Sequence, residues 1–293
     1  MVFREIRHHK HEQTEQPKVG VLKRIHMGGR LGNQLFSWAF AHQLPLCEER
    51  VLLISQSIDP ELSQLLHKCT HVEIGTISPL VRFKLKLYFK LSNKFKIMKP
   101  FISKAFRVSC EPDLLNISNS KDYCGFFQMY EYVKNSQEII FKELMASVQQ
   151  IDLPTSFLEW QNGRRYQCWH IRRGDYLLPE NSGYGLLSLE WYLKHKNSDM
   201  RTVIVTDDKA SALKLLKADD NYLILGPEDA NVFQALAIMS KSSHLVAANS
   251  TLSWWGGFLV ATQGYSVIYP TSEVEKHRDI NSPLFDLKPG VYD

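Results

Sequence analysis

The second half of the chain alternates short apolar runs with longer amphipathic segments. The apolar runs predict strands at 166–171, 201–206, 222–225, 244–248 and 265–269. The segments between them predict helices at 189–196, 209–217, 230–241 and 252–261, and Ser188 is placed to cap the first of them. Strands alternating with helices indicate parallel βαβ units in a doubly wound sheet, where ligands bind beyond the carboxyl ends of the strands.

The first half begins with the same pattern. Val19–Met27 predicts a strand, residues 28–33 a glycine-rich turn, and residues 34–44 a helix that Pro45 ends. A second strand is expected at Val51–Ile54. At about 100–200 residues per domain, the 293 residues indicate two domains. We expect the boundary near residues 152–154 or 162–163.

Residues 79–110 differ from the rest of the chain. They hold nine Lys or Arg residues and no Asp or Glu, and Phe, Tyr, Leu and Ile lie between the basic positions. Such a stretch is typical of a segment that makes peripheral contact with an anionic membrane, here through residues 79–107. A solvated helix pair with one core-facing side explains it equally well. No recognised nucleic-acid module accompanies the charge, so we expect no nucleic-acid partner.

Composition narrows the class of protein. Apolar residues make up 44% and charged residues 23% of the chain, and the net charge is 35 − 31 = +4. These values exclude collagen-like, disordered and disulfide-scaffold proteins. Five cysteines without a C-x-x-C spacing indicate reduced thiols in a cytoplasmic compartment. Residues 1–18 are polar and lack an apolar core, so we expect a flexible tail there, not a secretory signal.

Residues suited to an anionic ligand follow the first predicted strand. The loop from Gly28 to Gln34 has the spacing G-G-x-x-G, and glycines let a backbone turn tightly and approach a phosphate. It lacks both the G-x-G-x-x-G spacing of dinucleotide-binding folds and the P-loop spacing. A dehydrogenase or P-loop protein is therefore disfavoured, and an ordinary tight turn stays open as an explanation.

Charged residues follow two later predicted strands. Arg172 and Arg173 come directly after 166–171, and paired arginines can neutralise a diphosphate. Asp207 and Asp208 follow 201–206, where they could bind a base, a ribose or a metal, or simply cap the next helix.

Small polar residues follow a further strand. Asn249, Ser250 and Thr251 precede a predicted helix. They form either a second phosphate-binding site at the helix start or a simple helix cap. Trp254 and Trp255 line a sugar pocket or pack in the core. A glycine loop, an arginine pair, a carboxylate pair and a hydroxyl-rich helix start, all at strand ends, together indicate a nucleotide-diphosphate site.

Five segments resemble motifs of the α-1,2-fucosyltransferases, glycosyltransferase family 11. They are HMGGRLGNQLF at 26–36, GFFQ at 125–128 with Tyr130 and Tyr132, HIRRGDY at 170–176, TDD at 206–208 and ANSTLSWWG at 248–256. The resemblance implies a GT-B-like α/β fold with two Rossmann-like domains facing across a cleft. We place the N-terminal, acceptor-side domain at 19–155 and the C-terminal, donor-side domain at 156–293.

The resemblance also implies an activity, that of a galactoside 2-α-L-fucosyltransferase. Such an enzyme transfers L-fucose from GDP-β-L-fucose to the 2-hydroxyl of a terminal galactose, with inversion. The expected acceptor is a galactoside in surface-polysaccharide or O-antigen synthesis, and a lipid-linked form of it is one option. We expect a cytoplasmic protein, with peripheral contact at the inner face of the plasma membrane if the basic stretch binds lipid. Another nucleotide-sugar transferase and a non-catalytic nucleotide- or sugar-binding protein remain the alternatives.

Roles follow for single residues. We expect Arg172 to stabilise the departing diphosphate, and Asp175 and His170 are the candidate bases. Tyr176, Gln128 and Trp254 are assigned to the acceptor. The donor is assigned to Gly29, Arg30, Asn33, Gln34, Arg173, Asp207, Asp208, Asn249, Ser250, Thr251 and Ser253.

Two further expectations concern the donor. The chain has no D-x-D, so we expect no metal or other cofactor, with GDP-fucose as the co-substrate. Ala235 stands where the family usually carries an Asp, an acid that recognises guanine in related fucosyltransferases. Guanine recognition then shifts to Gln234, Asp207 or Asp208.

Overall fold

Two parallel sheets of five strands each organise the protein. The first has the order β3-β2-β1-β5-β4 and contains β1 (Lys23–His26), β2 (Val51–Ile54), β3 (Val72–Gly75), β4 (Val108–Cys110) and β5 (Asp122–Cys124). The second has the order β10-β9-β6-β7-β8 and contains β6 (Tyr166–Ile171), β7 (Arg201–Thr206), β8 (Tyr222–Leu225), β9 (His244–Val246) and β10 (Ser266–Ile268). The prediction of parallel βαβ units is confirmed. The chain order changes direction beside β1 and beside β6, where α/β sheets bind ligands.

The computed structural model describes residues 23–44, 51–54, 62, 72–75, 78–110, 120–216 and 222–270. The expected tail at 1–18, the helix-ending Pro45, and Cys47 and Cys69 lie outside these ranges. Cys110, Cys124 and Cys168 are free thiols. Within the described residues, no helix combines the length and the apolar character needed to cross a membrane.

Helices connect the strands at or near their predicted positions. Ser188 accepts a hydrogen bond from the Trp191 amide and caps α8, as predicted. The first helix begins at Leu31, three residues earlier than predicted, because the end of the glycine loop is already helical. The helices are α1 (Leu31–Ala41), α3 (Pro79–Lys94), α4 (Lys99–Phe106), α5 (Tyr130–Lys134), α6 (Gln137–Val148), α7 (Thr155–Gln161), α8 (Leu189–Lys194), α9 (Lys209–Leu216), α10 (Val232–Ser240) and α11 (Thr251–Thr262).

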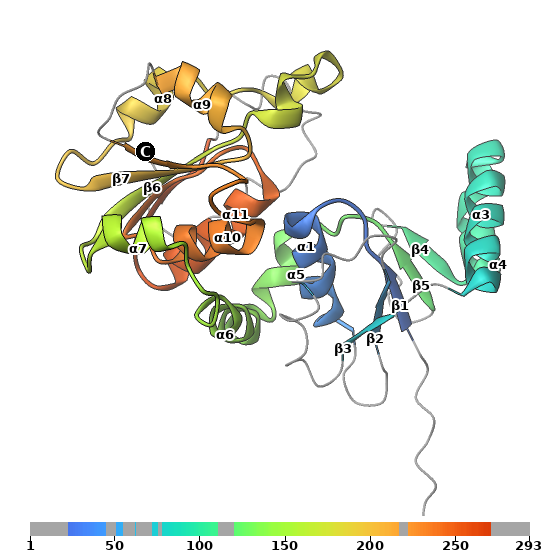
Figure 1. Ribbon diagram of the computed structural model, residues 1–293. Coiled ribbons are helices and arrows are strands. Elements are labelled where there is room, and N and C mark those ends of the chain that lie inside the picture. The colour runs from blue at the N-terminus through green and yellow to red at the C-terminus, as the bar shows by residue number, and fades with distance from the viewer. Residues whose placement is uncertain are drawn as a thin grey trace, which may run out of the picture.

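Helices α1 and α11 join the two sheet units (Figure 1). The Phe36 ring of α1 lies 4.8 Å from that of Trp254 and 5.0 Å from that of Trp255, centroid to centroid. The Trp255 indole nitrogen donates to the Gly32 carbonyl at 3.0 Å. Helix α6 lies within the expected first domain, yet it packs on α10 and α11 of the second unit. One continuous apolar core therefore runs across both units.

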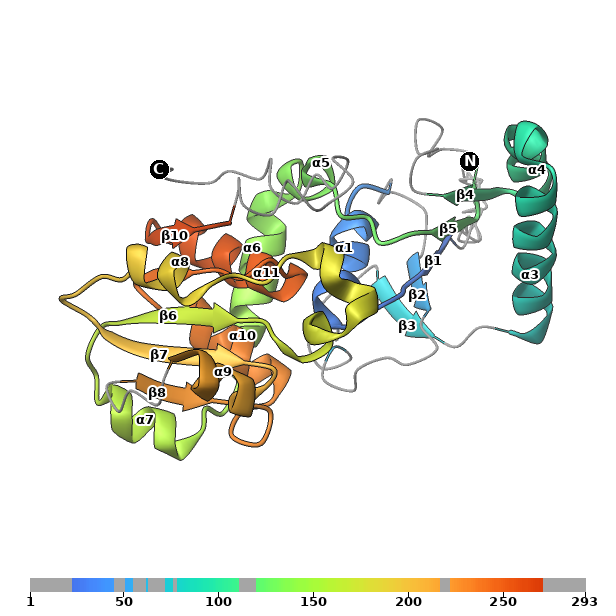
Figure 2. The same ribbon diagram turned by 90° about the horizontal axis from the view of Figure 1, so that it is seen from above.

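Helices α3 and α4 form a hairpin at the β4 edge of the first sheet, remote from the second unit in both views (Figures 1 and 2). Leu85, Tyr88 and Val108 form a small buried cluster beneath it. Ile102 and Phe106 of α4 pack against this cluster. The basic stretch is thus a helix pair with one core-facing side, which was one of the two structural expectations for it.

Candidate active site

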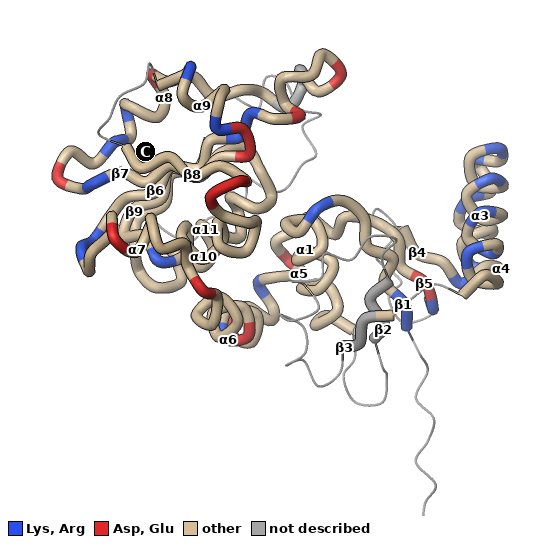
Figure 3. The backbone as a smooth tube through the Cα atoms, viewed as in Figure 1, with Lys and Arg blue, Asp and Glu red and all other residues tan. Residues whose placement is uncertain are grey.

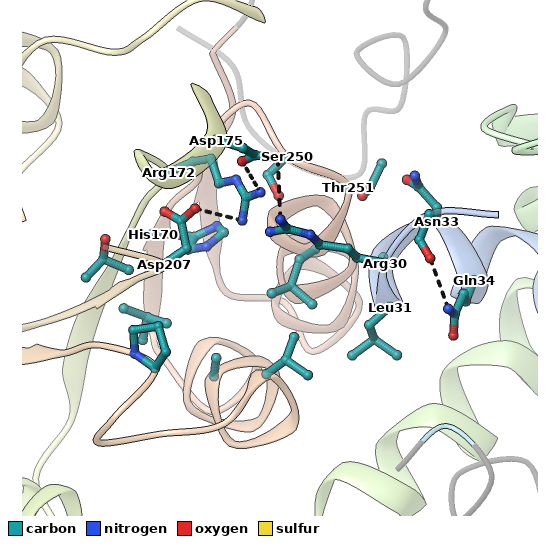
Figure 4. A pocket seen from close by; sticks show the side chains of 18 of the residues that line it. Arg30, Leu31, Asn33, Gln34, His170, Arg172, Asp175, Asp207, Ser250 and Thr251 are labelled. Carbon is teal, nitrogen blue, oxygen red and sulfur yellow. Dashed lines mark hydrogen bonds and ion pairs between the residues drawn. The ribbon is translucent and has the colours of Figure 1, made fainter. Parts of the chain in front are cut away.

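A cavity of about 880 Å³ lies between the two units. It opens at the carboxyl ends of β1, β6 and β7, the position expected for a ligand in such sheets. Of the residues assigned from the sequence, the cavity brings together Gly29, Arg30, Asn33, Gln34, Gln128, His170, Arg172, Asp175, Tyr176, Asp207, Ser250 and Thr251. Figure 4 shows part of this lining.

Three helices begin at the cavity. Leu31 of α1, Val232 of α10 and Thr251 of α11 all line it. The first amides of a helix have no partner within the helix and carry a partial positive charge, so helix N-termini favour anions. Because α1 comes from the first unit and α10 and α11 from the second, an anion in the cavity faces helix starts from both sides.

Arg172 is held in the cavity by two carboxylates (Figure 4). Its Nη2 donates to Asp175 Oδ1 at 2.5 Å, and its Nη1 lies 3.0 Å from Asp207 Oδ2. Its guanidinium also lies 5.2 Å from the centre of the Tyr176 ring, and the Tyr176 hydroxyl donates to the Asn249 carbonyl. These contacts fix the orientation of the guanidinium before any ligand binds.

A second arginine reaches the same carboxylate from the other unit. Arg30, the residue before α1, places its Nη2 3.6 Å from Asp175 Oδ2. Its side chain is 73% exposed, whereas that of Arg172 is 15% exposed. Asp175 therefore links the fixed arginine of the second unit to a more exposed arginine of the first.

Arg173 does not line the cavity. Its Nη2 lies 3.3 Å from the Leu187 carbonyl, and its amide donates to Asp207 Oδ1 at 2.7 Å. A Cβ at Gly174 would lie 2.3 Å from Asp207 Oδ2, so this position needs glycine for the carboxylate to approach. The Arg173 side chain thus engages a backbone carbonyl outside the cavity lining, and its expected contact with the donor stays a prediction.

His170 lines the cavity and is 3% exposed. Burial, together with the nearby charge of Arg172, lowers the pKa of His170 to about 3. The ring is therefore neutral at pH 7, and a base with such a pKa accepts protons poorly. Its Nδ1 has no hydrogen-bond partner among the described residues. The other candidate base, Asp175, has both carboxyl oxygens engaged by arginines.

Four other assigned residues lie outside the cavity lining. Asp208 caps α9 through the Ser211 amide and hydroxyl, at 3.0 and 2.6 Å. Ser253 accepts from the Ala248 amide at 2.7 Å, and Asn249 is buried. Trp254 packs against Phe36 and Phe258 in the core. In this structure Asp208 caps a helix, Ser253 accepts from a backbone amide and Trp254 packs in the core, and the expected contact of these side chains with donor or acceptor stays a prediction.

The first unit contributes two side chains beside a strained backbone. Phe127 has φ +53°, and its buried ring stacks on that of Phe40 at 4.4 Å. On either side of it, Phe126 and Gln128 line the cavity, and Phe126 is 47% exposed. Gln128 donates to Asn33 Oδ1 at 2.8 Å. The left-handed turn at Phe127 thus lets two nearby side chains face the same space.

Sequence reasoning placed Phe126 in the GFFQ motif without giving it a role, and it missed the loop before α10. Asn231 lines the cavity and forms a capping box with Gln234, a spacing that the sequence displays. Gln234 is not part of the lining and also donates to the Asp152 carbonyl. Ala235 does line the cavity. Of the three residues suggested for guanine, only Asp207 reaches the cavity, and Arg172 already engages it.

The structure thus has two facing Rossmann-like units with a cavity between them, at which three helices begin. The chain belongs to glycosyl transferase family 11, whose sequence model matches residues 11–283. It is therefore a glycosyltransferase of GT-B architecture, as the sequence resemblance implied. No three His, Cys, Asp or Glu side chains of the described segments gather as metal ligands.

Known proteins resemble the chain at low identity. The O-antigen biosynthesis glycosyltransferase WbnK of Escherichia coli is 22% identical over 282 residues, which cover 83% of this chain and 92% of WbnK. The E. coli heptosyltransferase WaaC with ADP has a TM-score of 0.42 and 15% identity, covering 86% of this chain and 89% of that one. The fucosyltransferase NodZ from Bradyrhizobium has a TM-score of 0.46 and 9% identity, covering 82% and 93%.

Proposed function

We propose that the protein transfers L-fucose from GDP-β-L-fucose to the 2-hydroxyl of a terminal galactose, forming an α-1,2 linkage with inversion and without a metal. The observation that carries this proposal is the placement of Arg172. It lies half-buried between two carboxylates, at a cavity where three helices begin. Fixed positive charge at that point stabilises a departing diphosphate, the electrostatic role that dominates many transfer reactions.

The reaction is a single displacement. The galactose 2-hydroxyl oxygen bonds to the anomeric carbon of fucose while the bond from that carbon to the β-phosphate oxygen breaks. Arg172 and the Ser250–Thr251 start of α11 face the charge that develops on GDP. The acceptor hydroxyl gives its proton to water as the new bond forms, and GDP leaves. Because His170 is a weak base and Asp175 is paired with arginines, a loose transition state that needs little base assistance suits this site.

The acceptor lies on the first unit, beside Gln128 and Phe126. The name of the E. coli relative supports an acceptor in O-antigen or surface-polysaccharide synthesis. We propose a lipid-linked form of this acceptor, which places the protein in the cytoplasm, at the inner face of the plasma membrane. Ala235 lines the donor side of the cavity with a methyl group where the family usually carries an Asp. The test must therefore compare different nucleotide-sugar donors.

Turnover with defined donors tests the proposal. Purified protein is mixed with GDP-fucose, a galactose-terminated oligosaccharide and excess EDTA, and GDP release and the product linkage are measured. We expect α-1,2-fucosylated product, and a loss of kcat on the order of 10²–10³ for Arg172→Ala. Arg165→Ala, an exposed position, is the matched control. Turnover only with GDP-mannose or a UDP-sugar, abolition by EDTA, or donor binding without product would overturn the proposal.

A further inference from the structure

The outer side of the α3–α4 hairpin exposes large apolar side chains. Leu80 is 78% exposed and Phe83 66%, while Ile97 in the turn after α3 is 95% and Phe101 of α4 72% exposed. Leu85 and Tyr88, by contrast, point into the cluster beneath the hairpin. The hairpin thus has an inner apolar side that packs against the sheet and an outer apolar side that faces solvent. A helix pair needs only the inner side to pack in a core, so the outer side calls for another explanation.

Basic side chains flank this outer side. Arg82, Lys86 and Lys90 follow one another every four residues and therefore lie on one face of α3, and all three are exposed. Residues 78–110 contain no carboxylate, so no acidic side chain of the hairpin offsets them. Figure 3 shows the basic positions along α3. We call Arg82, Lys86 and Lys90, with Leu80, Phe83, Ile97 and Phe101, the hairpin surface.

We propose that the hairpin surface docks on an anionic lipid bilayer. Its exposed aromatic and aliphatic side chains enter the boundary between headgroups and acyl chains, and the lysines and arginine lie against lipid phosphates. The mixture of cations and protruding apolar groups decides between occupants. A purely electrostatic partner would gain nothing from exposed Ile97 and Phe101, and a purely apolar partner would have to desolvate the cations.

The hairpin is anchored so that docking leaves the active site open. Lys84 of α3 places its Nζ 2.6 Å from the buried carboxylate of Asp122 on β5, which fixes the inner side of the helix to the sheet. The hairpin lies at the β4 edge, remote from the second unit in both ribbon views. Its use in reaching a lipid-linked acceptor rests on the proposed function, but the docking itself does not.

Vesicle sedimentation of the full chain tests the charges. We expect the protein to sediment with vesicles of phosphatidylcholine containing about 30% phosphatidylglycerol, and with pure phosphatidylcholine far less. Raising NaCl from about 50 to about 500 mM should weaken binding. The triple variant Arg82→Gln, Lys86→Gln, Lys90→Gln should lower the partition coefficient on the order of 100-fold, about fivefold per charge.

A matched triple variant separates local from global charge. Arg165→Gln, Lys194→Gln, Lys214→Gln removes the same charge from exposed positions of the second unit and should bind as the wild type does. No sedimentation of the wild type at low salt, or an equal loss in both triple variants, overturns the proposal. Sedimentation unchanged in the hairpin variant does the same, and would leave the surface to a protein partner.

The apolar half of the surface has its own variant. Phe83→Ser, Ile97→Ser, Phe101→Ser changes only exposed positions, so circular dichroism and thermal unfolding should match the wild type. Its vesicle binding should fall at least tenfold and become more sensitive to salt. Binding equal to that of the wild type contradicts insertion. Since binding is measured without substrate, failure of the proposed glycosyl transfer would not affect this result.

Discussion

Gly32 sets how closely the two units approach, so replacing it with alanine should disable the enzyme while leaving it folded. The N-terminal turn of α1 meets that of α11 at this residue. A Cβ at Gly32 would lie 2.5 Å from the Leu252 amide nitrogen and 2.7 Å from the Thr251 carbonyl carbon. Both neighbours are backbone atoms, so no rotation of a side chain can relieve the contact.

The size of the effect follows from these distances. Non-bonded heavy atoms are most stable at about 3.5–4.0 Å, so α1 and α11 must separate by about 1 Å. Overpacking of this kind costs about 1–3 kcal/mol of stability. A misplacement of about 1 Å at the reacting groups costs on the order of 10²-fold in rate. The separation would lengthen the gap between Arg30 and Asp175, which come from different units.

The assay compares kcat/KM for fucosyl transfer and the thermal midpoint of Gly32→Ala with those of Gly163→Ala. Gly163 has φ +69° and open space around it, so alanine there costs about 1–2 kcal/mol of backbone strain without a clash. We expect both variants to lose stability and only Gly32→Ala to lose activity. Activity of Gly32→Ala within a few-fold of the wild type would refute the idea that this contact sets the cavity.

Four further outcomes are expected. Asp122→Asn should lower the unfolding free energy by about 3 kcal/mol in urea titrations, because Arg24 and Lys84 lose their buried partner. Burial alone would raise the pKa of Asp122, but hydrogen bonds from His26, Arg24 and Lys84 outweigh it and lower that pKa, so the wild type should lose this stability as pH falls below about 4. Burial lowers the pKa of His170 in the folded state, so the unfolded state binds the proton first as pH falls below 6.5. The unfolding free energy of the wild type should therefore drop by about 2 kcal/mol between pH 7.5 and 5, and that of His170→Gln should not. Phe126→Ala should raise the acceptor KM about 3–10-fold and leave the donor KM unchanged, since the exposed ring lines the cavity on the first unit; an equal rise in both constants would contradict this. Asp175→Asn should tighten GDP binding in calorimetry, because it removes a negative charge from the cavity, and should lower kcat, because it loosens Arg172. Weaker GDP binding would contradict the placement of the diphosphate beside Arg172 and Asp175.

Much of the second unit was predictable from its sequence. Strands β6, β7 and β8 have the predicted bounds, because buried strands of a parallel sheet are continuous apolar runs with polar ends. Helices α8 and α10 begin or end one or two residues away from the prediction, since terminal residues keep helical composition after the hydrogen bonds stop. The exposed side of the hairpin was not predictable, because helical periodicity shows only that apolar faces exist, not which of them are covered.

The site was predictable as a set of strand ends, but not residue by residue. Arg172 and Arg173 illustrate the reason. Consecutive side chains diverge, so one enters the cavity while the other turns to the Leu187 carbonyl. Asp207 and Asp208 divide in the same way, the first holding Arg172 and the second capping α9. Sequence motifs identify such pairs, and only the fold shows which member faces the ligand.

The charges of the cavity come from both units, which bears on the proposed binding of a donor diphosphate. Arg172 and Arg30 stand opposite Asp175 and Asp207, so the formal charges of the four side chains sum to zero. A diphosphate that binds Arg172 must therefore compete with the two carboxylates for hydrogen bonds from its guanidinium group. The N-termini of α1, α10 and α11 supply the remaining positive potential. The first turn of each of these three helices contains no acidic residue. Because α1 belongs to one unit and α10 and α11 to the other, that potential converges only when the units are held together, so the proposed donor site depends on the α1–α11 contact.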